Sequence, residues 1–157
     1  MVTVVVILVL SGGAMAAFLK FNRTQTIVND ARQLVAEINR VRSLAVGLQY
    51  PNGCVTLKGY NIKSVLINGS LAGVTVTALC SPGDIVSPPS LLLNSSEFNS
   101  AFDITFAPES GYLTTGADAE IIIRDNIDAT VTKKVTVGVY GTITLTDNNQ
   151  DGGWRWI

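Results

Sequence analysis

The sequence contains no histidine among its 157 residues. Histidine is the commonest general base and metal ligand in proteins, and it is the central member of the Ser-His-Asp triad. Its absence restricts any hydrolase hypothesis to Ser–Lys or carboxylate pairs. The chain also lacks a Gly-rich phosphate-binding loop and a nucleophile elbow. We therefore expect a non-enzymatic protein without catalytic residues, a cofactor or a histidine-based metal site.

The chain has almost no net charge. Eleven Lys and Arg residues stand against twelve Asp and Glu residues, which gives a net charge of −1 at pH 7. This balance supplies no general electrostatic attraction to nucleic acid or to acidic lipid. We therefore do not expect nucleic acid as a partner.

Charge is wholly absent from the first part of the chain, Met1 to Leu19. At about 1.5 Å per residue this stretch forms a helix roughly 28 Å long, close to the hydrocarbon thickness of a bilayer. It therefore predicts a membrane-spanning helix. A cleaved secretory signal would need a basic region before Val2 and a small-residue cleavage site, and neither is clear.

Basic residues follow this stretch at Lys20 and Arg23. Since basic residues normally stay on the cytoplasmic side of a span, these two alone would place the rest of the chain inside the cell. A pair of cysteines and a body rich in short strands favour the outside instead. We therefore expect a basic leader upstream of Met1 and a single pass through a membrane, with the body of the chain outside the cell.

Apolar side chains recur alternately four and three residues apart between Thr24 and Leu48. This is the period of one face of an α-helix. The stripe comprises Ile27, Ala31, Leu34, Ile38, Val41, Ala45 and Leu48. We expect it to pack on a sheet, and a coiled-coil partner face is the alternative. Gly47 and the turn from Tyr50 to Gly53 are expected to end the helix, because Pro disfavours helix in the residue before it and Gly tolerates positive φ.

The chain after Pro51 is typical of β-structure. Alternating or β-branched runs occur at Val55–Leu57, Val65–Ile67, Val74–Leu79, Ile104–Phe106, Ile121–Ile123, Val135–Tyr140 and Ile143–Leu145. Turn-forming clusters such as Asn68-Gly69-Ser70 separate them, which favours hairpins in one mainly antiparallel sheet around a single core. Ser87 to Ser100 is the best candidate for a loop. The predicted fold class is α+β, a long N-terminal helix packed on an antiparallel β-domain.

The two cysteines, Cys54 and Cys80, each lie at an end of a strand-like run. In an exported domain this pair favours a disulfide that clamps the first strands after the helix. Two buried free thiols and a metal-binding pair are the alternatives, although two cysteines without histidine make a poor zinc site.

The succession of these elements resembles a known class of proteins. An apolar helix such as MVTVVVILVL, continuing into an amphipathic helix and then a β-domain, is similar to the type IV pilins and to the pseudopilins of type II secretion. In that class a leader ends in Gly, and the processed, methylated chain begins with a segment such as Phe-Thr-Leu-Ile-Glu. Met1 would follow that glutamate, so we expect the leader and the first mature residues upstream of this sequence.

The resemblance implies three parts in the chain. Residues 1–21 would form the transmembrane and filament-core half of the helix, residues 22–50 the amphipathic half, and residues 51–157 the antiparallel β-domain.

Further stretches resemble the minor pseudopilins of the GspH/FimT type. ARQLVAEINRVRSLAVG is similar to a family helix that ends in Arg-Ser-x-Ala, and FAPESGYLTTGADAEIIIRD with KKVTVGVYGTITL is similar to a Phe-x-Pro-x-Gly turn and a closing strand pattern. The matching residues are Arg42, Ser43, Ala45, Phe106, Pro108, Gly111, Val135, Val137, Gly141 and Ile143. The turn has one residue more between Pro108 and Gly111 than the family's pattern. We interpret Phe106, Pro108 and Gly111 as a core aromatic, a turn starter and a residue with positive φ.

The resemblance implies a structural subunit that assembles through its N-terminal helix into a type II secretion or type IV pilus filament. Its partners would be other pilins or pseudopilins and inner-membrane assembly proteins. Small residues would let such helices pack closely, and they are Ser11, Gly12, Gly13, Ala14, Ala16 and Ala17, with Gly12, Gly13, Ala16 and Ala17 as the chief candidates for contact. The glycine pair would either loosen the helix or serve ordinary packing. The competing hypotheses are a DNA-binding minor pilin of competence and a membrane-tethered exported enzyme or binding protein.

The C-terminal tail carries two further candidate features. The stretch from Asp147 to Asp151, with Gly152, matches the opening of a calcium loop, but no bidentate acid follows it, and a hairpin turn gives the same string. Trp154-Arg155-Trp156 could stack on bases. With a single arginine and acidic residues upstream, packing of the two aromatics on the sheet or on a neighbouring subunit is the favoured interpretation.

Overall fold

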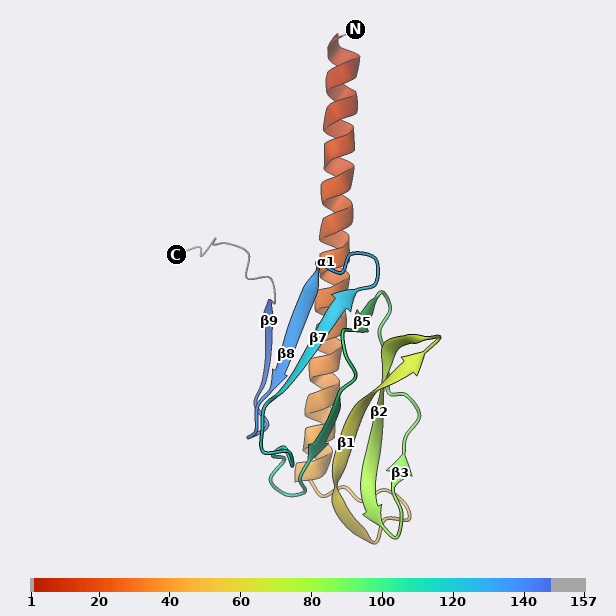
Figure 1. Cartoon of the computed structure of the whole chain (residues 1–157), viewed down its shortest axis with the longest axis vertical. Coiled ribbons are helices and arrows are strands. Elements are labelled where there is room, and N and C mark those ends of the chain that lie inside the picture. Colours follow the sequence, from red (N-terminus) through yellow and green to blue (C-terminus); the bar gives the residue numbers. More distant parts are fainter. Residues whose placement is uncertain (1, 148–157) are drawn as a thin grey trace.

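The structure is a computed structural model that describes residues 2–147, with the backbone alone for residues 2–14, 16, 17 and 147. Within these residues one helix, α1 (Val2–Val46), precedes all the strands (Figure 1). The strands are β1 (Thr56–Ile67), β2 (Ser70–Ser81), β3 (Ile85–Val86), β4 (Leu91–Leu92), β5 (Ser96–Phe98), β6 (Asp103–Phe106), β7 (Ala119–Asp125), β8 (Thr132–Val137) and β9 (Ile143–Asp147). The predicted α+β class is confirmed.

The strands form two sheets, where the sequence analysis expects one. The first has the order β3-β2-β1-β6, with β4 also paired to β2, and the second has the order β5-β7-β8-β9. Every strand pair within the described residues is antiparallel, as expected from the hairpin turns. β6 pairs with β1 and so belongs to the first sheet, whereas β5 pairs with β7 and so belongs to the second. Each sheet then covers a different part of the helix.

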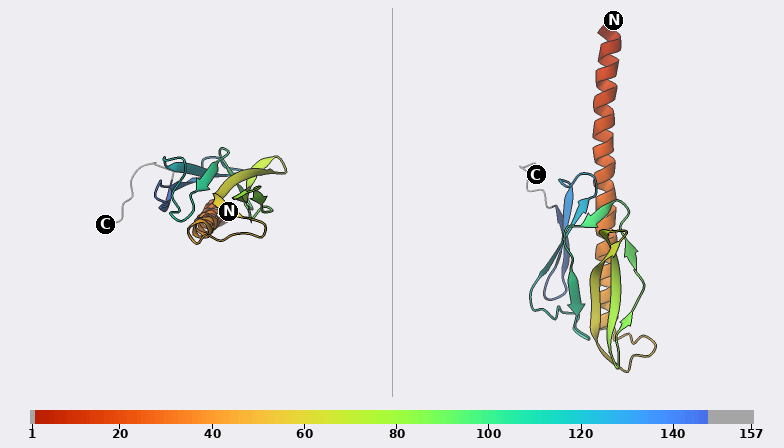
Figure 2. Two further views of the ribbon diagram at one scale, coloured as in Figure 1. Left: turned by 90° about the horizontal axis from the view of Figure 1, so that it is seen from below. Right: turned by 45° about the vertical axis from the view of Figure 1, so that its right-hand side comes forward.

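The amphipathic half of α1 packs on both sheets through its apolar stripe (Figure 2). Six stripe side chains are fully buried, namely Ile27, Ala31, Leu34, Ile38, Val41 and Ala45. They share one core with strand residues such as Ile62, Val74, Ile123 and Val135. Each large aliphatic side chain buried in this way contributes about 2 kcal/mol to stability. The core-face interpretation is confirmed over the coiled-coil alternative.

The N-terminal half of α1 projects beyond the β-domain (Figure 1). The side chains of residues 15 and 18–22 are exposed, among them Met15, Phe18, Leu19 and Phe21. Over the described part of the chain, no helix is long and apolar enough to cross a membrane. The predicted membrane-spanning segment, Met1 to Phe21, falls mainly on side chains outside that description.

The helix ends at Val46, just before Gly47, as predicted, but the residue with positive φ differs from the prediction. Gly47 does not take positive φ; Leu48 does, with φ 48°. The amide of Leu48 donates to the carbonyl of Ala45, and the amide of Gln49 donates to the carbonyl of Leu44. These two bonds define a Schellman motif with leucine in the position that usually carries glycine. Leu48 accepts this conformation because its half-buried side chain packs against the core, so burial outweighs backbone preference.

Two further expectations about strands need correction. β1 runs unbroken from Thr56 to Ile67, where two separate runs are predicted, because the polar Asn61 between them is satisfied by neighbouring side chains of β6. The predicted loop from Ser87 to Ser100 contains β4 and β5. Each of these is only two or three residues long, which is too short to leave a period in the sequence.

A disulfide joins Cys54 to Cys80, with the Cα atoms 5.4 Å apart. Cys54 lies just before β1. Cys80 lies near the end of β2, where it pairs with Leu57 of β1. The cross-link therefore closes the open end of the β1–β2 hairpin. It confirms the predicted pairing and excludes the alternatives of free thiols and a metal pair.

Replacing Cys54 with Ser is expected to destabilise the protein by about 3 kcal/mol, since the cross-link no longer restricts the unfolded chain. Urea unfolding measures the difference. Adding reductant to the unchanged protein should lower its urea unfolding midpoint to that of the variant. The midpoint of the variant itself should not change. Quantitative thiol labelling of the native, unreduced protein would contradict the cross-link.

Candidate functional site

The C-terminal end of α1 meets two turns that are distant in the sequence. The first turn, from Ala107 to Tyr112, follows β6, and the second, from Gly138 to Thr142, connects β8 to β9. We call the meeting point of Arg42, Ala45, Gly111 and Gly141 the helix-end node. It brings together four of the residues that carry the pilin-like motifs.

Hydrogen bonds fasten the first turn to the helix. The amide of Glu109 donates to the carbonyl of Ala45 over 3.1 Å, so this carbonyl at the end of the helix accepts a second hydrogen bond beside the one from Leu48. Nε of Arg42 donates to the carbonyl of Gly111 over 3.4 Å. The half-buried guanidinium of Arg42 therefore has a structural role, because it holds the turn against the helix.

Both glycines of the helix-end node are required by conformation and by space. Gly111 has φ 63° and Gly141 has φ 79°, in the left-handed region that other residues rarely adopt. A Cβ on Gly141 would lie 2.7 Å from the carbonyl oxygen of Gly111 and 2.8 Å from Cζ of Arg42. The arginine side chain thus lies directly against the second turn.

The remaining motif residues divide between core and surface. Phe106 is fully buried, and Pro108 begins the turn that Gly111 ends. Ser43 does not join the node, because its exposed hydroxyl donates to the carbonyl of Asn39 one turn back in α1. The sequence motifs contain all four node residues, but their spacing does not predict that Arg42 contacts the turn at Gly111.

An exposed aromatic pair lies on the outer side of these turns. Tyr112 and Tyr140 pack edge to face with their ring centroids 5.4 Å apart, and both side chains are exposed. Sequence reasoning misses this pair, because its members belong to turns separated by a strand hairpin.

Polar groups hold the middle of α1 in place. Asp30 is buried in the helix face, and its carboxylate accepts a hydrogen bond from the hydroxyl of Ser96 in β5 over 2.5 Å.

On the surface of α1, the guanidinium of Arg40 donates to both carboxylate oxygens of Glu37 over 2.6 and 2.8 Å. These bonds lower the pKa of Glu37 from its ordinary value, against the opposing effect of burial.

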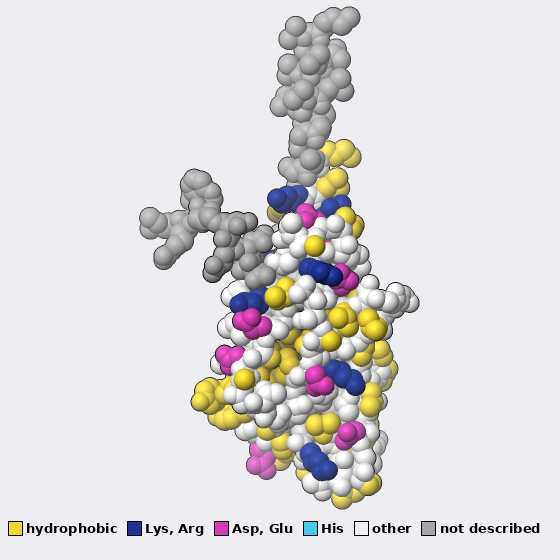
Figure 3. Space-filling model, viewed as in Figure 1, with side chains coloured by type: hydrophobic (Ala, Val, Ile, Leu, Met, Phe, Trp, Pro, Cys, Tyr) yellow, Lys and Arg dark blue, Asp and Glu magenta, His cyan; other side chains and the backbone are white. Residues whose placement is uncertain are grey.

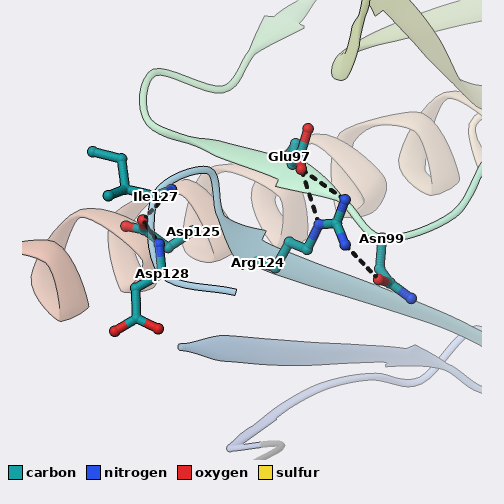
Figure 4. A network of polar contacts seen from close by, with 6 residues as sticks. All are labelled: Glu97, Asn99, Arg124, Asp125, Ile127 and Asp128. Atoms are coloured by element: carbon teal, nitrogen blue, oxygen red, sulfur yellow. Dashed lines mark hydrogen bonds and ion pairs between the residues drawn. The ribbon is translucent and has the colours of Figure 1, made fainter. Parts of the chain in front are cut away.

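A second polar network ties the strands of the second sheet together (Figure 4). Arg124 of β7 pairs with Glu97 of β5 over 2.8 Å and donates to the side chain of Asn99 over 3.3 Å. At the end of β7, the buried carboxylate of Asp125 accepts hydrogen bonds from the amides of Ile127 and Asp128. The β7–β8 turn, residues 126–131, is therefore fixed by a side chain of the strand before it.

The other predicted positions fall largely outside this description. Gly12, Gly13, Ala16 and Ala17 lie in the projecting half of α1, and the helix runs through the glycine pair without a break. The calcium candidate from Asp147 to Asp151 and the tryptophans Trp154 and Trp156 lie beyond β9, outside the described residues apart from the backbone of Asp147. Among the side chains that are described, no group of three His, Cys, Asp or Glu residues could hold a metal ion.

Crystal structures of the type IV minor pilin FimU of Pseudomonas aeruginosa share this fold. In one crystal form the TM-score is 0.57 over 80% of this chain and 92% of FimU. In another it is 0.51 over 75% of this chain and 90% of FimU, with 17% sequence identity in both. No family model matches the sequence, and no curated protein matches it. The chain therefore has a type IV pilin-like fold.

Replacing Gly141 with Ala tests the helix-end node, and Gly116 supplies a matched control. Gly116 also has positive φ, but a Cβ there meets nothing within 4 Å. Gly116→Ala is expected to cost about 1 kcal/mol of unfolding free energy, and Gly141→Ala about 3 kcal/mol, because the added methyl group also displaces Arg42.

Removing the Arg42 side chain should then recover about 1 kcal/mol of the Gly141→Ala effect in a double-mutant cycle. Urea unfolding of the four variants gives all the terms. Equal costs at Gly116 and Gly141 would show that the close approach in the node does not contribute to stability.

Proposed function

We propose that this chain is a pilin-like structural subunit that is held in the bacterial inner membrane by the N-terminal half of α1 and assembles through it into a filament. The carrying observation is the division of α1. Its second half is fully committed to the β-domain through the buried stripe, while its first half projects with exposed apolar side chains at Met15, Phe18 and Phe21. Such a surface is unfavourable in water and is covered in lipid or among like helices.

The β-domain supports a role in assembly more than one in catalysis. Several of its titratable side chains are engaged in structural bonds, as with Glu97 to Arg124 and Glu120 to Lys134. The pilin-like fold, together with the minor pseudopilin motifs at the helix-end node, favours a minor subunit of a type IV pilus or of a type II secretion filament. The β-domain would then lie on the outer side of the membrane, where the Cys54–Cys80 disulfide is stable.

Filament assembly would bring the projecting helices of several subunits together. Van der Waals packing between helices in lipid depends on small residues that let backbones approach. Gly12 and Gly13, with Ala16 and Ala17, are among the small residues of this half. We assign helix contact to them.

Replacing Gly12 and Gly13 with Leu should leave the chain in the membrane fraction, because hydrophobicity rises, while chemical crosslinking to partner subunits in the native host falls sharply. The matched control replaces Val5 and Val6 with Leu, which changes size in the same helix without filling a small-residue position. Undiminished crosslinking of the glycine variant would contradict this assignment and favour Trp154 and Trp156 as contacts.

A further inference from the structure

The helix face that packs on the sheets changes character where it leaves the domain. From Ile27 toward the N-terminus, the next positions on this face are Arg23 and Lys20, four and three residues apart. The stripe is therefore apolar where it is buried, from Ile27 onward, and basic at the next two positions toward the N-terminus. Exposed apolar side chains, Phe18 and Phe21 among them, lie at this same level of the helix.

The β7–β8 turn lies beside this basic segment. Leu19, Lys20 and Arg23 of the helix line a shallow depression together with Asp128 and Val131 of the turn. Figure 3 shows charged side chains of both signs around the point where the helix leaves the domain. The pKa of Asp128 is lowered by hydrogen bonds from Thr130, and the positive charges of Lys20 and Arg23 add to this effect.

The turn holds an apolar side chain outward at its tip. Ile127 is 71% exposed, although its backbone amide is bound to the buried Asp125 carboxylate over 2.7 Å. Figure 4 shows its side chain pointing away from the polar network that anchors the turn. Because three further backbone bonds fix the turn, at Asp125, Asn126 and Val131, the exposure of Ile127 is built into the fold.

We propose that this end of the domain, formed by Lys20, Arg23 and the β7–β8 turn, is a docking surface for an anionic lipid bilayer. Lys20 and Arg23 would bind lipid phosphates, and Ile127 would enter the headgroup region beside the helix. The near-zero net charge of the chain does not oppose this, because the attraction is local and acts over about one Debye length. The contact would fix the orientation of the domain on the membrane before assembly.

Two properties favour a bilayer over a second copy of the chain as the occupant. The surface is continuous with the helix half that we place in the membrane, so the inference depends on the proposed function. The order of side chains along the helix, apolar then basic, also follows the order of hydrocarbon and phosphate in a leaflet.

The test uses the full chain in vesicles of phosphatidylcholine with and without phosphatidylglycerol. Both cysteines of the chain are paired, so Ile127→Cys provides a single thiol for an environment-sensitive dye. Val86→Cys in β3, toward the far end of the domain and 62% exposed, is the matched control position. Met15→Cys reports on insertion of the helix.

The dye at Ile127 should shift to the blue and be quenched by lipid-borne quenchers in vesicles with phosphatidylglycerol, while the dye at Val86 stays as in buffer. The double variant Lys20→Gln, Arg23→Gln should weaken this response, because each basic side chain at an anionic surface contributes about fivefold in partitioning. Asp128→Asn, which keeps its hydrogen-bond acceptor for Thr130, should strengthen it.

A response at Met15 with none at Ile127 would overturn the docking surface and leave the membrane anchor intact. No response at Met15 would overturn the anchor itself, and the docking surface with it. A response at Ile127 that follows the protein-to-lipid ratio and ignores phosphatidylglycerol would also overturn the proposal, because it would identify a second copy of the chain as the occupant.

Discussion

Burial of one face of α1 is the interaction on which the rest of the structure depends. Six consecutive stripe positions, from Ile27 to Ala45, are removed from water by strands of both sheets. Within the described residues the two sheets share no ladder, so the helix is the element that they have in common. Neither sheet could bury its inner face alone, since each has only one layer of strands.

The two ends of the packed stripe have different tasks. At the C-terminal end, Arg42 and the carbonyl of Ala45 fasten the turns around Gly111 and Gly141, so the far end of the domain is rigidly tied to the helix. Midway, the buried carboxylate of Asp30 bonds to Ser96. A buried polar pair of this kind fixes which face of a helix meets which strand, because any other register would leave the carboxylate without its partner.

At the N-terminal end the packing stops and the helix continues alone. The sheets bury the helix face from Ile27 onward, and the proposed function assigns the projecting half to lipid or to other helices. The change from Ile27 to Arg23 marks the boundary. A rigid domain on a long helix suits a subunit whose neighbours are chosen by helix contact.

The sequence predicts the features that follow from a regular apolar spacing over many residues or from a single possible pairing. The spacing of Ile27 to Ala45 identifies the buried face, and the positions of Cys54 and Cys80 at strand ends identify the cross-link. Both follow from local rules, because helical period and hairpin geometry act within a few tens of residues.

The predictions from sequence fail where contacts between distant parts of the chain determine the local structure. Leu48 takes positive φ in place of Gly47 because the core holds its side chain, and Asn61 stays in a strand because Asp103 and Thr105 satisfy its amide. The hydrogen bond between Arg42 and Gly111 joins residues 69 positions apart in the sequence, so no local sequence period predicts it. The exposure of Ile127 likewise follows from the turn geometry that Asp125 imposes.

The proposed division of α1 near Ile27, into a half that builds the domain and a half that does not, is tested most directly by thermal unfolding of a chain that lacks Met1 to Phe21, followed by circular dichroism. We expect a soluble protein with one cooperative transition. Stability should fall markedly when the deletion extends through Asp30 and removes Ile27. An unfolded or aggregated product of the shorter deletion would contradict the division.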